Sequence, residues 1–247
     1  MKNYLPGIFL LAFISFTGCK KEPNGGTTPV KFNTTAYASL GTFDAQGKPN
    51  YLEPKDMISK GLYDFVVAQL PEKVDIRTSH AEYLKDADLA VTEKSDVYIT
   101  FVNEGTANLN TIGFYTYKTG APPVAPADIE KITYIFPNST FLSSGAVLNR
   151  GDKVKLGSFE AGTSIGFVLL ANGWNASAQN VDSKAAHYCS NKELNPENRV
   201  ELKPHTVLID YPAENKVIIG FEDINRTDPK CDHDFNDVVM YATVTAK

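Results

Sequence analysis

The sequence is poor in the residues that mark soft-metal and nucleotide-dependent chemistry. Its 247 residues include only three cysteines and four histidines, and no CxxC pair, Cys/His cluster with zinc-site spacing or HExxH motif occurs. No glycine-rich phosphate-binding loop is present either. These absences argue against a zinc finger, a zincin-type protease and a nucleotide-binding enzyme. Together with the crowding of acidic residues described below, they lead us to expect no enzymatic activity.

Basic residues are not in excess, and no internal repeat is visible. The 24 lysines and arginines are outnumbered by 29 aspartates and glutamates, which gives a formal net charge of −5. Nucleic-acid binding requires a basic patch, so we expect no nucleic-acid partner.

The N-terminus has the pattern of a secretory signal. Lys2 precedes an apolar stretch, Ile8 to Ile14, that is too short to remain in a bilayer as a helix. The following Phe-Thr-Gly-Cys resembles the lipobox of bacterial lipoproteins, including Bacteroidetes-like ones, which implies cleavage after residue 18 and acylation of Cys19. The alternative is an ordinary signal peptide with a chance cysteine. Residues 19–30 are expected to form a flexible polar tether. The resemblance implies an outer-membrane lipoprotein, and leaves open whether it faces the periplasm or the medium.

The most informative segment lies near the C-terminus. Oxygen-bearing side chains crowd together there: Glu222, Asp223, Asp232, Asp234, Asn236 and Asp237. Five carboxylates packed without a cation would repel one another and raise their pKa values. Ca²⁺ takes about 6–8 oxygen ligands and removes this conflict, so the segment predicts a calcium site. An acidic, solvated hairpin loop is the alternative.

The spacing excludes an EF-hand. Counting from Asp232, positions six and twelve of the loop hold Asp237 and Thr243, where an EF-hand needs Gly and Glu. The residues after Asp237 read as a strand and not as an exiting helix. The ligands are therefore expected from two neighbouring strand ends. Strand alternation would direct His233 away from the ion.

The remaining sequence predicts an all-β fold, an antiparallel and jelly-roll-like β-sandwich. β-branched and aromatic runs separated by turn residues predict strands at 96–102, 111–117, 132–136, 164–170, 206–209, 216–221 and 238–244. Residues 206–221 should form a hairpin. Apolar residues at three- and four-residue steps from Met57 to Leu70 predict one N-terminal amphipathic helix, which Pro71 ends. We expect a single domain over 31–247, with 31–90 as an N-terminal elaboration.

Two cysteines remain once Cys19 is assigned to lipid. Cys189 and Cys231 form an even number in an oxidising compartment, so they are either a disulfide that braces the acidic segment or two buried free thiols.

Three segments in this order resemble one family: 164–175, the hairpin ending in Gly-Phe-Glu-Asp, and Asp-x-Asp-Phe-Asn-Asp-Val-Val at 232–239. They are similar to the DUF4114 family and the related LruC-type domain of bacterial lipoproteins and surface proteins, with 160–247 as the core region. The resemblance implies an extracellular β-sandwich whose acidic motif binds Ca²⁺, often in adhesins, and implies no reaction.

The family segment around residue 172 offers two further candidates. Asn172 is either an additional oxygen ligand or a turn residue with positive φ. Trp174, the only tryptophan, is a candidate stacking platform for a sugar ring. We therefore expect a lipid-anchored calcium-binding module for adhesion, with a glycan or a surface protein as partner. The alternatives are a structural envelope lipoprotein without a small ligand and a glycan hydrolase.

Overall fold

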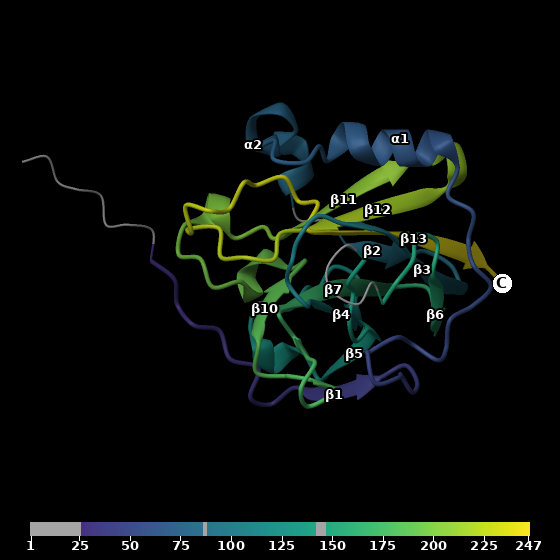
Figure 1. The fold of residues 1–247 in the computed structure, drawn as a ribbon, viewed down its shortest axis with the longest axis horizontal. Coiled ribbons are helices and arrows are strands. Elements are labelled where there is room, and N and C mark those ends of the chain that lie inside the picture. The colour runs from purple at the N-terminus through teal and green to yellow at the C-terminus, as the bar shows by residue number, and fades with distance from the viewer. Residues whose placement is uncertain (1–25, 86–87, 142–146) are drawn as a thin grey trace, which may run out of the picture.

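Two stacked β-sheets, a small two-stranded sheet of Trp174–Asn175 and Asn180–Val181, and a few short helices make up the computed structural model, which describes residues 26–85, 88–141 and 147–247 (Figure 1). The strands are β1 (Ala36–Ser39), β2 (Leu89–Val91), β3 (Ser95–Glu104), β4 (Thr111–Lys118), β5 (Lys131–Phe136), β6 (Lys153–Phe159), β7 (Thr163–Ala171), β8 (Trp174–Asn175), β9 (Asn180–Val181), β10 (Ala186–Cys189), β11 (Thr206–Tyr211), β12 (Lys216–Phe221) and β13 (Val238–Ala246). The helices are α1 (Lys60–Gln69) and α2 (Ile76–Ser79), with 3-10 turns at Ala81–Leu84, Pro126–Asp128, Lys192–Leu194, Val200–Leu202 and Pro212–Glu214.

The first sheet has the strand order β1-β5-β4-β7-β10, with β2 also paired to β7. The second has the order β11-β12-β13-β3-β6. All seven predicted strands are present, and the predicted hairpin is β11–β12, joined by the turn at Pro212–Glu214. The prediction of a mostly β fold with stacked antiparallel sheets is confirmed.

The first sheet departs from a strict jelly roll because it is mixed. β1 pairs with β5 in parallel, with Ala36 opposite Lys131. This pairing brings together segments almost one hundred residues apart, which no local pattern specifies. The antiparallel description therefore holds for the second sheet and for the other pairs of the first.

The main apolar core lies between the two sheets. Inward-facing residues of β3, β4, β7, β12 and β13 form one buried cluster that includes Ile99, Phe167, Ile219 and Met240. The continuous apolar run of β7 is explained by its central place, because residues on its other face, such as Val168 and Leu170, pack in a separate cluster on the outer side of the first sheet.

The predicted helix covers the outer face of the second sheet, above β11 and β12 in Figure 1. Ser59 caps α1 by accepting the backbone N–H of Leu62 at 3.0 Å, so Met57 and Ile58 lie before the helix, and Met57 is 91% exposed. Leu62 and Val66 face the sheet and pack with Phe235 and Tyr241.

The N-terminal segment is tied to the domain earlier than the expected tether allows. Thr27 bridges to Glu197, and the N–H of Thr28 donates to the carbonyl of Pro196. The signal, Cys19 and the first part of the tether lie outside the described residues. Within the described residues, no helix has the length and apolarity needed to cross a membrane.

Candidate metal centre

The predicted site is the β12–β13 loop, residues 222–237, which lies at one end of the sandwich beside α2 (Figure 1). The loop is pinned where it leaves and re-enters the sheet: Glu222 N donates to the His205 carbonyl at 3.0 Å, and Asp237 N donates to the Phe221 carbonyl at 3.1 Å. Inside it, His233 and Phe235 have positive φ values of 59° and 57°. Two such residues so close together are unusual and point to a constrained, functional turn.

Three of the six predicted ligands converge. Glu222, Asp232 and Asp234, here called the acidic trio, each offer a carboxylate oxygen, and these oxygens lie within 4.8 Å of one another. Glu222 is 1% exposed and Asp234 is 2% exposed. Backbone N–H groups orient them: Phe235 N donates to Glu222 Oε1 at 3.0 Å, and Lys73 N donates to Asp234 Oδ2 at 2.7 Å.

The other two carboxylates form a neighbouring pair. Asp223 N donates to Asp237 Oδ2 at 2.8 Å. Asp223 Oδ2 in turn accepts the side-chain amides of Asn108 and Asn110 at 2.9 and 2.7 Å. Both asparagines come from the β3–β4 connection, so three separate segments build this part of the loop.

Asn236 is placed between β3 and the end of α1. Its side-chain amide donates to the Leu70 carbonyl at 3.4 Å, and its Oδ1 lies so close to Gly105 that a Cβ there would approach it to 2.3 Å. A side chain at position 105 would displace Asn236.

Burial makes this loop electrostatically costly without a cation. It raises the pKa of Glu222 to about 7 and that of Asp234 to about 6. It also raises the pKa of Asp232, and burial together with the Asp223 carboxylate raises the pKa of Asp237. Desolvation disfavours the charged form in every case, and the neighbouring carboxylates add repulsion.

The donor set fits a hard divalent cation. The trio and the Asp223–Asp237 pair offer carboxylate oxygens only, and in the trio each oxygen that accepts a backbone N–H has a further lone pair. Glu222, Asp232 and Asp234 would hold Ca²⁺, with Asp223 and Asp237 beside them. The ion would supply the positive charge that balances the desolvated carboxylates.

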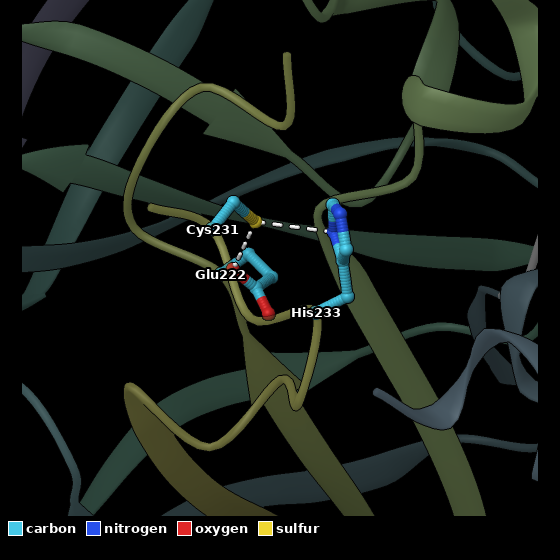
Figure 2. Close-up of side chains that lie close together, drawn as sticks. All are labelled: Glu222, Cys231 and His233. Carbon is cyan, nitrogen blue, oxygen red and sulfur yellow. Dashed lines mark hydrogen bonds between the residues drawn. The ribbon is translucent and has the colours of Figure 1, made fainter. Parts of the chain in front are cut away.

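The strand alternation used to predict the direction of His233 is not present, and its direction relative to an ion stays a prediction. Alternation assumed a strand, whereas residues 232–237 form a turn in which His233 has positive φ. Its ring therefore turns inward, and Nδ1 lies 3.1 Å from Cys231 Sγ (Figure 2).

Of the two alternatives for the cysteines, the structure has free buried thiols. Cys189 packs on the outer face of the first sheet with Tyr115 and Val168, whereas Cys231 donates to Glu222 Oε2 at 2.9 Å inside the loop. The Cys189–Cys231 disulfide is not formed, because each thiol is packed in a different cluster.

The candidate stacking role of Trp174 is not supported by its burial. Trp174 is 3% exposed and packs edge-on against Phe43, so neither face of the indole is open to a sugar. Asn172 is the turn residue, with φ of 51°. Its Oδ1 accepts Leu109 N at 3.1 Å, and its Nδ2 donates to Asn108 Oδ1 at 3.1 Å, so it supports the asparagines that hold Asp223.

Several residues of the centre were missed by sequence reasoning. Asn108 and Asn110 have the same alternate spacing as the acidic residues, which was a usable signal. Arg226 had none: it is fully buried, its Nε donates to His233 Nδ1 at 3.3 Å and its guanidinium lies over the Phe235 ring.

Comparison with known proteins places this loop in a family. Residues 159–245 match the model of a domain of unknown function, DUF4114. Searches of curated proteins and of solved structures found no match. The matched region holds β7 to β13 but not β3 and β4, to which β13 and β7 pair, so the sandwich extends beyond the match. The chain therefore contains a DUF4114 domain at residues 159–245.

Proposed function

We propose that this chain is a calcium-stabilised β-sandwich, lipid-anchored at the bacterial cell envelope, that serves as an adhesion or protein-binding module. The observation that carries the proposal is the acidic trio, in which Glu222 and Asp234 are buried and Asp232 is more exposed. Three carboxylate oxygens within 4.8 Å, two of them on almost fully buried side chains, are unfavourable unless protonated or bound to a cation.

The ion would act by joining three parts of the molecule. Asp234 accepts the backbone N–H of Lys73 after α1, Asp223 is held by the β3–β4 connection, and Glu222 directly follows β12. Calcium would fix this end of the sandwich as one surface. A site that forms only in the folded state adds about 2.7 kcal/mol of stability when free Ca²⁺ is a hundredfold above Kd.

Burial of Trp174 directs the proposal toward a protein partner. The hypothesis of glycan binding depended on Trp174 as an exposed stacking platform, but this side chain is buried. The alternative is a structural lipoprotein of the cell envelope. It would use the same calcium site, and it differs from the proposed module only in having no partner outside the cell.

Two observations argue against a hydrolase: the carboxylates crowd into one loop, and the serine motif at residues 162–166 is not in the required structural context. Gly162 to Gly166 has the GxSxG spacing of a nucleophile elbow, but Thr163 begins β7 and no helix follows. Ser164 is fully buried, and its hydroxyl pairs with that of Thr119 at 2.9 Å. That environment gives a substrate no access to the oxygen.

Thermal unfolding under chelation tests the calcium site. EDTA should lower the melting temperature and excess Ca²⁺ should restore it. Asp234→Asn should abolish this response. Because the amide nitrogen cannot accept one of the two backbone N–H groups bound by Asp234, from Lys73 and Asn236, the variant is compared with itself in EDTA and in Ca²⁺. Asp210→Asn is the matched control, since Asp210 is exposed in β11 and pairs with Val217 at the far end of the hairpin. Equal melting temperatures with EDTA and with millimolar Ca²⁺ would refute the site.

Membrane attachment is tested separately. Cells expressing the chain and fed a labelled fatty acid should incorporate the label, and Cys19→Ala should prevent incorporation. Labelling that survives the substitution would contradict the anchor without affecting the calcium site.

A further inference from the structure

A second group of potential metal ligands shares Glu222 with the acidic trio. Glu222, Cys231 and His233, here called the thiol cluster, are all buried and each place one ligand atom within 4.8 Å of the other two. Figure 2 shows the thiol between the carboxylate and the imidazole, with both contacts drawn. We propose that these three side chains bind a Zn²⁺-type divalent metal, at a site distinct from the calcium site.

The ligand chemistry separates the two sites. Ca²⁺ selects oxygen ligands, whereas a thiolate and an imidazole select Zn²⁺ and similar ions of borderline softness. Cys231 and His233 are not among the calcium ligands proposed above, so this inference does not rest on the proposed function. Three protein ligands would leave one position of a tetrahedral ion for water.

The distances require only a small opening. Zinc bonds of about 2.0–2.3 Å at tetrahedral angles set ligand atoms roughly 3.4–3.6 Å apart. Cys231 Sγ lies 2.9 Å from Glu222 Oε2 and 3.1 Å from His233 Nδ1. The sulfur and its two neighbours therefore need to separate by about half an ångström.

Without a metal, Cys231 contacts both Glu222 and His233, and these contacts hold the three side chains close together. The thiol proton lies toward Glu222 Oε2, in the region that the metal would take. On binding, the S–H bond breaks, a sulfur–metal bond forms, and the proton leaves to solvent. No oxidant or reductant is needed.

The surrounding charges balance with a dication in place. One carboxylate and one thiolate neutralise the two positive charges of the metal. Glu197 adds a negative charge near the adjacent Arg226; its Oε1 accepts the backbone N–H of Arg226 at 3.1 Å and contacts His205 Nε2 at 2.9 Å. Glu197 Oε2 and Arg226 Nη2 are buried and have no hydrogen-bond partner among the described residues, so this layer retains room to rearrange.

Arg226 must move slightly for the metal to bind. Its Nε donates to His233 Nδ1 at 3.3 Å, the atom that faces Cys231. It is also anchored by the Pro204 carbonyl and by the Phe235 ring, so losing the histidine contact does not release it. This requirement predicts that Arg226→Lys, with a smaller head group, binds the metal at least as well as the wild type.

Cobalt substitution tests the inference. The full chain, reduced and titrated with Co²⁺, should develop a thiolate-to-cobalt charge-transfer band with one ion per chain, and Zn²⁺ should bleach it. Cys231→Ser should remove the band and weaken Co²⁺ binding by at least about 100-fold, since even outer-shell losses cost 10–100-fold. Cys189→Ser and Cys19→Ser should retain both.

Substitutions that each affect one site distinguish the zinc-type site from the calcium site experimentally. Asp234→Asn should lose the calcium response of the melting temperature and keep the cobalt band, and Cys231→Ser should show the reverse. Glu222→Gln should weaken both responses.

A measurement on the wild type avoids dependence on variant folding. X-ray absorption of the zinc-loaded chain should show one sulfur among nitrogen and oxygen neighbours. A shell of nitrogen and oxygen alone, or a cobalt band unchanged by Cys231→Ser, would overturn the inference.

Discussion

The interior between the sheets and the interior of the β12–β13 loop are both almost inaccessible to water, but their chemistry is opposite. Between the sheets, Ile99, Phe167 and Met240 are buried among other apolar side chains, and their burial is favourable by itself. Inside the loop, Glu222, Asp234 and Arg226 are buried to the same degree. Their burial is unfavourable unless charges are paired. The first interior is therefore stable by its own packing, whereas the second stays unfavourable as long as its charges are not paired.

The largest effect should come from opening the apolar interior. Phe167→Ala removes a ring from the centre of β7 and should lower the free energy of unfolding by about 3–5 kcal/mol. Urea unfolding measures this loss. Val124→Ala, at a mostly exposed position, is the control and should change it by less than about 0.5 kcal/mol. The stabilisation by calcium should be unchanged in Phe167→Ala; a lost calcium response would show that the two interiors are not independent.

The second effect is the contribution of Glu222, in the loop, to the pH dependence of stability. The pKa of Glu222 is about 7 in the folded chain, above its ordinary value of 4.5. The folded state then holds more protons than the unfolded state between these values, so stability falls as pH rises from about 5 to 8. For this one group the loss is on the order of 2–3 kcal/mol.

Calcium distinguishes this effect from other titrations. Urea unfolding in EDTA at pH 5 and at pH 8 should show the loss, and excess Ca²⁺ should remove most of it because the cation stabilises the charged carboxylates. Glu222→Gln should flatten the profile in EDTA. The lowered pKa values of His187 and His233 act in the opposite direction and are common to both proteins, so the difference between the two profiles isolates Glu222. Identical profiles for the wild type and Glu222→Gln in EDTA would contradict the assigned pKa shift.

The contrast between the two interiors also explains what the sequence could predict. Strands such as β7 and β13 are marked by their own residues, because apolar periodicity is a local property. Alternation in β6, with Val154 and Leu156 buried between half-buried lysines, was a readable signal that was overlooked. The parallel pairing of β1 depends on distant contacts and left no local mark.

For the candidate site, residue types were predictable and their grouping was not. The acidic residues near the C-terminus are evident from composition. Their division into the trio and the Asp223–Asp237 pair follows from positive φ at His233 and Phe235, which the sequence does not indicate because positive φ is uncommon for any residue other than glycine. The thiol cluster was hidden because Glu222 is nine residues before Cys231, and only the fold brings them together.

A third and smaller effect should come from the asparagines that support Asp223. Asn110→Ala removes an amide that donates to Asp223 Oδ2 at 2.7 Å and an oxygen that accepts Asn172 N at 3.0 Å. It should lower the free energy of unfolding by about 1–3 kcal/mol. Asn110→Asp places a like charge beside Asp223, so in EDTA it should be less stable than Asn110→Ala. Calcium should rescue it by more than it stabilises the wild type; an identical rescue would mean that Asp223 does not sense the ion.

The smallest effect should come from the N-terminus of α1. This end of the helix lies away from the charged loop, so a change there should affect the loop least. Ser59→Ala removes the cap on Leu62 N and should cost about 1 kcal/mol, a shift of roughly 2–4 °C in melting temperature. Leu62 packs on the second sheet, whereas the other end of α1 reaches the loop, where the Leu70 carbonyl accepts Asn236 and the Lys73 amide donates to Asp234. If the helix transmits the loss along its length, the calcium-induced shift will shrink in Ser59→Ala. We expect it to stay the same, because a missing cap frays the first turn, and the sheet contacts of Leu62 and Val66 hold the rest.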